Sequence, residues 1–361
     1  MLQLPLSATV ANPVFLLQIY NLYLQTMAHI ATKRFTYWGQ LGILMAFTGV
    51  GLIIGGILSL IPLISRMDIS MLTNLKGVTD FVNNPDNANA VRIMQFISVL
   101  FLFFLPAFFY ARLCHKRALL HLGFVKIPSL KQLLIIVAIM FFALFIVGAL
   151  AEIWQQIPFP KNWQIKFKAA EEIYSKQIQV MARMNGAGDF IISLFIVALL
   201  PAVFEEVFFR GALQNLLSRW LKTPVWAVII TAVIFSAMHG SYDGFLPRFV
   251  LGFILGWLFY RTGNIWVNIT AHFINNAVGI VTLYFYSKPH TPTDISKLDD
   301  RFPIWLGAVG VIAVIFLLKA FDNVSKNEID RPGEEVILPG YINPNNPFAD
   351  DADNIGNPNQ A

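Results

Sequence analysis

The sequence predicts an all-α protein, a polytopic transmembrane helix bundle of about eight spans. Three observations predict it: 56% of the 361 residues are apolar, only 13% are charged, and the mean hydropathy is +0.61. Soluble domains carry about 25% charged residues, so this composition excludes an ordinary soluble enzyme and a disordered chain. The 32 phenylalanines are expected on helices that face lipid.

Eight apolar stretches approach the roughly 20 residues that a helix needs to cross a bilayer. They cover residues 41–64, 93–110, 133–150, 190–209, 225–238, 249–260, 265–285 and 304–321. The fifth and sixth stretches are short, so their ends are the least defined. The fourth and seventh carry ionisable residues inside otherwise apolar sequence, which sets them apart from the other six.

The segments outside these stretches differ in composition. Residues 1–40 hold a short apolar run without a preceding basic region, which predicts an interfacial segment rather than a signal peptide. Residues 151–189 mix tryptophans with lysines and are expected to form a loop at the membrane surface. Residues 322–361 contain two basic and eight acidic residues, a net charge of −6 against +11 for the rest, and predict an acidic disordered tail.

Three further divisions complete the expected organisation: N-terminal transmembrane helices over 41–150, a core over 190–285, and a last transmembrane helix within 286–321. The loop 111–132 carries Arg112, Lys116, Arg117, Lys126 and Lys131. Short basic loops stay in the cytoplasm, so both termini are predicted to be cytoplasmic. Basic residues of this kind indicate orientation in a lipid bilayer, and we expect no nucleic-acid partner.

Ionisable residues inside the apolar stretches mark the expected site. Glu205 and Glu206 are adjacent, His239 ends the fifth stretch, and His272 lies within the seventh. Charged groups in bilayer helices cost several kcal/mol, so they usually face the protein interior or a cavity. Each is therefore a functional candidate.

Spacing of four residues adds partners to this set. Glu206 and Arg210 share a helix face and can form an ion pair, which accounts for one glutamate but leaves Glu205 in another environment. His272 and Asn276 likewise project from one face of their helix. Three spans thus contribute polar groups that are able to meet.

This set suits the activation of water. A desolvated carboxylate can act as general base, and an imidazole with an amide can donate to a developing oxyanion. Alternatively, Glu205, His239 and His272 could hold a zinc ion with an open position for water. The sequence does not separate these two versions, and its single cysteine, Cys114, excludes a multi-cysteine metal site.

The same residues resemble the three motifs of the CPBP family. That family, also called Abi, groups CAAX prenyl-protein proteases with bacteriocin-processing and bacteriocin-immunity proteins. Its motifs E-E-x-x-x-R, F-x-x-x-H and H-x-x-x-N are matched in order by residues 205–210, 235–239 and 272–276. The resemblance covers about residues 190–285, roughly a quarter of the chain.

The resemblance implies an intramembrane endopeptidase, a hydrolase that is described in the family both as a metalloprotease and as a metal-independent glutamate protease. Carried over by position, Glu205 and His239 activate water, and His272 and Asn276 stabilise the oxyanion. Glu206 and Arg210 order the site. Zinc is left open as a cofactor, and the substrate is a peptide or protein that enters from the membrane or the cytoplasmic side.

Three rival interpretations remain. Residues 186–189 (Gly-Ala-Gly-Asp) and 242–243 (Tyr-Asp) resemble the motifs of presenilin-type aspartyl proteases, but in reversed order and at span ends. A proton-coupled transporter could use the same buried groups, although no internal repeat supports it. A catalytically silent scaffold or bacteriocin-immunity protein would keep the motifs without turnover. We expect the endopeptidase, in a bacterial inner membrane.

One pair of glycines, spaced four residues apart, is expected to have a structural role. Gly252 and Gly256 form a G-x-x-x-G pattern, which is expected to let two helices of this chain approach closely.

Overall fold

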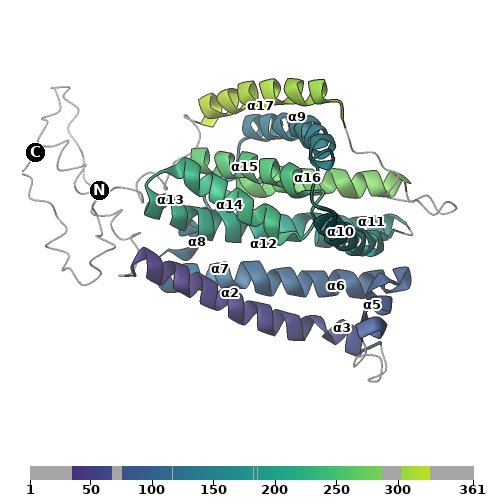
Figure 1. Ribbon diagram of the computed structural model, residues 1–361. Helices are drawn as coiled ribbons and strands as arrows, with labels where there is room; N and C mark the ends of the chain where they lie inside the picture. Colours follow the sequence, from purple (N-terminus) through teal and green to yellow (C-terminus); the bar gives the residue numbers. More distant parts are fainter. Residues whose placement is uncertain are drawn as a thin grey trace, which may run out of the picture.

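The computed structural model describes residues 35–66, 75–115, 117–181, 183–184, 186–286 and 302–325, and these residues form helices without strands. This confirms the predicted polytopic helical bundle. The outermost elements are α2 (Tyr37–Ser59) and α3 (Ile61–Ile64) on one side and α9 (Leu130–Gln155) with α17 (Ile304–Ser325) on the other (Figure 1). The predicted N-terminal interfacial segment and nearly all of the acidic tail lie outside the described residues.

Five of the described helices are long and apolar enough to cross a membrane. They cover Tyr37–Ile64, Pro85–Cys114, Leu130–Gln155, Ala187–Leu221 and Ile304–Ser325. The remaining three predicted stretches are also helical, as α14 (Pro224–Met238), α15 (Phe245–Thr262) and α16 (Ile265–Tyr286). Of these three, α14 is apolar but shorter than a full span, so the polytopic bundle is supported whereas the number eight stays a prediction.

Two of the long helices widen before a proline. The second span runs through η2 (Pro85–Asn87), α6 (Ala88–Val99), the π-helical η3 (Leu100–Phe104) and α7 (Leu105–Cys114), with Pro106 just after η3. The short helix α5 (Leu75–Asn83) precedes it. In the fourth span, Pro201 follows the π-helical η4 (Leu194–Leu199). A proline ring clashes with the carbonyl one turn earlier and supplies no N–H, and a π-bulge accommodates both defects.

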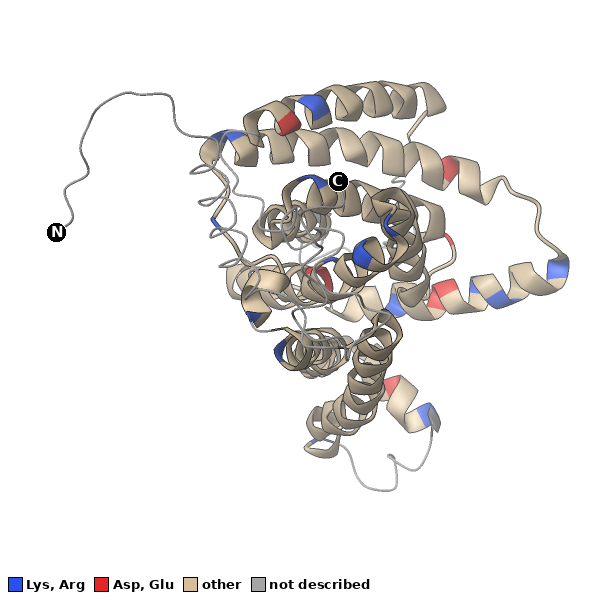
Figure 2. Cartoon of the chain, turned by 90° about the vertical axis from the view of Figure 1, so that its left-hand side faces the viewer, with Lys and Arg blue, Asp and Glu red and all other residues tan. Residues whose placement is uncertain are grey.

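The segment 151–189 contains a helix rather than irregular structure alone. It is α10 (Lys161–Met181), which carries most of the charged side chains of that segment. Figure 1 shows α10 nearly end-on where its neighbours are seen from the side, so it runs across the bundle. Most of the remaining helical ribbon is uncharged (Figure 2).

The C-terminal end of α10 is tied to the second span. Val180 and Met181 pack with Ala88 and Val91 of α6, and buried Arg92 donates from Nε to the Met181 carbonyl over 2.9 Å. α10 is thereby held at one end of the bundle.

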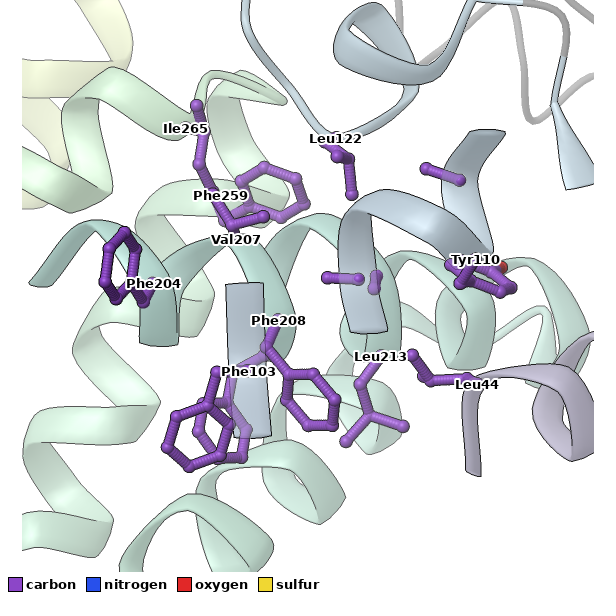
Figure 3. Close-up of a cluster of buried hydrophobic side chains, with 14 of the residues drawn as sticks. Leu44, Phe103, Tyr110, Leu122, Phe204, Val207, Phe208, Leu213, Phe259 and Ile265 are labelled. Carbon is purple, nitrogen blue, oxygen red and sulfur yellow. The ribbon is translucent and has the colours of Figure 1, made fainter. Parts of the chain in front are cut away.

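The main hydrophobic core joins the N-terminal helices to the fourth span. That span comprises α11 (Ala187–Ser193), η4, α12 (Leu200–Glu206), the π-helical η5 (Val207–Gln214) and α13 (Asn215–Leu221). Phe208 and Phe209 of η5 each pack against Phe103 of η3, with ring centroids 5.3 and 5.4 Å apart. Around them lie Leu44, Tyr110 and Leu213 (Figure 3). This packing fixes the helix that carries the glutamate pair.

Candidate active site

The two adjacent glutamates end α12, where the fourth span changes from α-helix to π-helix. Both are buried, Glu206 fully and Glu205 to 8% exposure. Adjacent residues of a helix point about 100° apart, so the two carboxylates meet different neighbours. Their surroundings divide the site into an anchored part and an open part.

Glu206 forms the anchored part. Arg210 Nη1 donates to its Oε1 over 2.9 Å, and His272 Nδ1 lies 2.8 Å from the same oxygen. Asn268 Nδ2 donates to Oε2 over 3.3 Å. Both carboxylate oxygens are thus satisfied by groups from two helices, and Glu206 with Arg210 is a buried ion pair whose separation would leave an uncompensated charge.

Arg210 also links the fourth span to α15 through its second amino group. Nη2 donates to the Gly252 carbonyl over 3.1 Å, and one turn later Gln214 Nε2 donates to the Gly256 carbonyl over 2.8 Å. The guanidinium stacks over Phe235 at 4.7 Å. Packing within the chain thus agrees with the expected role of the G-x-x-x-G step.

The glycines of that step have neighbours that leave little room for a side chain. A Cβ on Gly252 would lie 3.1 Å from Phe235 Cδ1 and 3.3 Å from Ala232 Cα, and one on Gly256 would lie 2.9 Å from Gln214 Oε1. The close contact between α14 and α15 therefore depends on both glycines.

Glu205 forms the open part. Its Oε2 lies 3.8 Å from His239 Nε2 and 4.0 Å from His272 Nε2. This oxygen is shielded from solvent and has no hydrogen-bond partner among the described residues. Two hydrogen bonds of about 2.8 Å that meet at a single water bridge a gap of about 4 Å, so the three atoms have the spacing of a water site.

The tautomers of the two imidazoles follow from their other contacts. His239, which follows α14 directly, places Nδ1 2.7 Å from the Phe235 carbonyl, which can only accept. His272 directs Nδ1 to the Glu206 carboxylate. In the neutral form each ring thus carries its proton on Nδ1, and each Nε2 presents a lone pair toward the side of Glu205.

A cavity of about 660 Å³ contains these groups. Asn276 lines it with Glu205, His239 and His272, and donates from Nδ2 to the Ala198 carbonyl over 3.4 Å. All six residues singled out in the sequence are therefore brought together, Glu206 and Arg210 behind the cavity wall and the other four on it. The rest of the lining is largely apolar and includes residues of α6, η3, α10, α14, α15 and α16.

The three atoms predicted as metal ligands match zinc in kind, since one carboxylate and two imidazoles are its usual donors. Ligand atoms about 2.1 Å from a tetrahedral zinc lie about 3.4 Å apart, closer than the 3.8 and 4.0 Å found here. Within the described ranges, no three His, Cys, Asp or Glu groups are placed to hold a metal ion. As placed, the residues fit a water better than a metal.

Two residues of the site were not singled out in the sequence, Asn268 and Gln214. Each lies four residues from a motif member, Asn268 before His272 and Gln214 after Arg210. A polar residue one turn from a motif residue inside an apolar helix is the signal that could have found them.

The aspartates of the rival presenilin-like motifs do not line the cavity. Asp189 lies 3.9 Å from Arg92 at the start of the fourth span. Asp243 lies in the loop between α14 and α15, where burial and the neighbouring Glu171 raise the pKa of its carboxyl. Among the described residues, the carboxylate that lines the cavity is therefore that of Glu205.

Comparisons with known proteins support the resemblance. Residues 187–278 match the family model of the type II CAAX prenyl endopeptidases, Rce1-like, which confirms the CAAX-protease resemblance over that segment. The chain is also 35% identical over 89 residues to the "Uncharacterized protein YpbD" of Bacillus subtilis (strain 168). That alignment covers 24% of this chain and 42% of the relative, which is less than half of the relative's length. No solved structure matches the chain.

Proposed function

We propose that this chain is an intramembrane endopeptidase of the CAAX-protease type, with Glu205 as the general base. The observation that carries the proposal is the buried Glu205 oxygen, which has no partner in the described chain and faces two imidazole nitrogens in a cavity. The family match over residues 187–278 supports the same reaction class. A bacterial inner membrane and a peptide substrate complete the proposal.

The first step uses a water held between Glu205 and His239. One hydrogen atom of this water bonds to Glu205 Oε2, and its second hydrogen atom bonds to the unprotonated Nε2 of His239. A lone pair of the water oxygen is left for attack. As the water oxygen bonds to the peptide carbonyl carbon, its proton passes to Glu205. General-base catalysis of this kind contributes about 10² to 10⁴ in rate.

The developing oxyanion needs donors. In the proposed mechanism His272 enters the reaction as an imidazolium, which offsets the net negative charge of Glu205, Glu206 and Arg210, and it keeps both of its N–H protons throughout. His272 would then donate from Nε2 while Nδ1 stays on Glu206, and the Asn276 amide would donate from the same wall. When the tetrahedral intermediate collapses, the proton on Glu205 moves to the leaving amine, and a carboxylic acid and an amine are released.

Zinc remains the alternative activator at Glu205, His239 and His272. The ion would supply a Lewis acid and lower the pKa of its water. The side chains would have to close the present gaps to reach it.

The test is peptide cleavage by the full-length protein in lipid vesicles, with Glu205→Gln, His272→Ala and a zinc chelator as separate arms. Cleavage should fall at least about 100-fold in Glu205→Gln, with the melting temperature kept because Glu205 Oε2 has no partner to lose. Activity that survives chelation supports the metal-free route, and activity lost on chelation and restored by zinc assigns the metal.

The rival functions predict other results. Cleavage retained in both variants would contradict the proposed roles. A cellular phenotype that survives Glu205→Gln would indicate a scaffold or immunity protein, and solute flux without cleavage would indicate a transporter.

A further inference from the structure

The cavity is lined by a positively charged side chain that the proposed mechanism does not use. Arg248, in the first turn of α15, lines the cavity together with Glu205, His239 and His272. Its Nη1 is shielded from solvent and has no hydrogen-bond partner in the described chain. No described carboxylate lies within 4.0 Å of its guanidinium nitrogens, whereas Arg210 and Arg261 each have such a partner.

The guanidinium is held by uncharged groups. Nη2 donates to the Tyr174 hydroxyl of α10 over 2.9 Å, and the Tyr174 ring lies 4.9 Å from the guanidinium carbon. On the other side, a Cβ at Gly244 would overlap the guanidinium, so this glycine provides the space that it fills. These contacts fix the orientation of Arg248 without neutralising its charge.

A guanidinium nitrogen that is shielded from water without a partner is unfavourable. Carboxylates match its planar fork with two parallel hydrogen bonds, and their attraction is strong where water is scarce. The same cavity is lined by Glu205, a carboxylate in the proposed mechanism, so an anionic ligand would be repelled there and attracted at Arg248.

We propose that Arg248 binds a carboxylate of the peptide substrate and selects substrates that carry one close to the scissile bond. The inference rests on the proposed endopeptidase function and adds the charge of its substrate. The carboxylate could be the C-terminal α-carboxylate or an Asp or Glu side chain, since both offer the same two oxygens. The experiment distinguishes these sources.

A purely structural role for Arg248 makes a different prediction. If its function were only to tie α10 to α15 through Tyr174, its loss would lower stability and would affect charged and neutral substrates alike. A carboxylate-binding role instead changes the ratio between the two kinds of substrate, mainly through KM.

The probe is a pool of palmitoylated dodecapeptides with randomised residues, presented to the full-length protein in vesicles. Cleaved members are identified by mass spectrometry. The best substrate is then made in three forms: with a free C-terminus, with a C-terminal amide, and as an amide with Glu at the last position. The ratio of kcat/KM between the charged and neutral forms is measured in each variant.

In the wild type we expect at least one charged form to be favoured roughly tenfold or more over the neutral amide, as for a charge-assisted hydrogen bond. The free acid alone is favoured if the α-carboxylate is the ligand, and both charged forms if a side chain suffices. The preference should collapse in Arg248→Gln and partly return in Arg248→Lys.

Two further variants sharpen the test. Gly244→Ala keeps the charge but displaces the guanidinium, and Ala tolerates the backbone there (φ −83°, ψ −1°), so the preference should fall. Arg261→Gln changes an arginine in the last turn of the same helix, paired with Asp322 away from the cavity, and should keep it.

The outcomes separate the two proposals. A wild-type ratio near one, or a preference that survives Arg248→Gln, overturns the role of Arg248 while cleavage that depends on Glu205 stands. Absence of any cleavage that depends on Glu205 removes the endopeptidase itself, and the inference with it.

Discussion

Two neighbouring glutamates of the site have different surroundings. Glu206 accepts from Arg210, His272 and Asn268 and is fully buried. Glu205 keeps one oxygen unpaired among the described residues and faces the cavity. Because adjacent helical residues diverge by about 100°, a Glu-Glu pair places one carboxylate in a fixed network and leaves the next one facing the cavity, where the proposed mechanism uses it as the base. In the proposed mechanism, the pair thus supplies both a rigid anchor and the reactive carboxylate.

His121, outside the spans, makes stability depend on pH. Burial, the stacked His115 ring 3.3 Å away and the cation Arg219 hold the pKa of His121 well below its ordinary value; Tyr110 also faces the ring. The unfolded chain binds a proton near pH 6.5, whereas the folded chain does not. The free energy of unfolding should therefore be full above about pH 6.5 and fall below it, by up to about 1.4 kcal/mol per pH unit.

The measurement is the melting temperature of the full-length protein in detergent between pH 8 and 5.5, for the wild type and His121→Phe. Neither ring nitrogen of His121 has a hydrogen-bond partner among the described residues, so Phe removes the titration without stranding another polar group. The variant should lose less stability on acidification. An equal loss in both proteins would contradict the prediction.

At the residue scale, sequence patterns predicted the members of the site but not their contacts. Spacing of four residues correctly paired Glu206 with Arg210. The approach of His239 and His272 to Glu205 depends on how three helices pack, which no local spacing specifies. The sequence did not mark Arg248, because it precedes the sixth apolar stretch, where an arginine is ordinary at a membrane interface. It becomes notable in the structure because no described carboxylate pairs with it and its Nη1 has no hydrogen-bond partner among the described residues.

At the scale of elements, the π-helical segments shape the contacts between spans. The carbonyl of Phe101 in η3 lies against Gly51 of α2, so closely that a Cβ on Gly51 would overlap it. Gly55, one turn later, would contact the Phe101 side chain in the same way. The first two spans thus meet along a face of α2 that has glycine at both positions.

This contact predicts different results for two glycines of one helix. Gly51→Ala forces α2 away from η3 and should destabilise the protein by about 1–3 kcal/mol, the usual cost of overpacking. Gly49→Ala has nothing within 4 Å of the new Cβ, and should be neutral or slightly stabilising because Ala favours helix. Melting temperatures of the two variants in one detergent make the comparison, and an equal effect would contradict the packing.

Hydropathy predicted where the apolar helices lie in the sequence, but it did not predict α10 or how that helix is arranged. All eight apolar stretches are helical, because apolar runs of this length bury their backbone polar groups only as helices. α10 was not foreseen as a helix, since its lysines and glutamates gave no apolar run. Its position across the bundle depends on contacts distant in sequence, such as Arg92 with Met181 and Arg248 with Tyr174.

At the scale of the whole molecule, the fourth span is the central element. Its η5 segment packs on the N-terminal helices through Phe208 and Phe209, and it bonds to α15 through Arg210 and Gln214. α9 and α17 lie side by side at the opposite edge from α2 (Figure 1). The site therefore lies where the N-terminal helices and the family-matched segment meet, and its cavity draws residues from both.

The arrangement predicts which parts of the chain share a side of the membrane. In Figure 1, α8 (Ala118–His121) and α10 lie at opposite ends of the bundle. Lys126 follows α8 in the basic loop that we expect in the cytoplasm, and Lys168 is exposed on α10. A cysteine replacing Lys168 should therefore react with a membrane-impermeant maleimide in intact cells, and one replacing Lys126 only after the membrane is opened.

The native chain suits this test because its single cysteine, Cys114, is buried and should label weakly in either condition. The opposite labelling pattern would invert the orientation while keeping the fold, since the two ends would still differ. Labelling of both cysteines from the same side would contradict the fold itself, because no orientation of a transmembrane bundle brings its two ends to one face of the bilayer. The pair of cysteines thus tests the direction of the bundle and its transmembrane character separately.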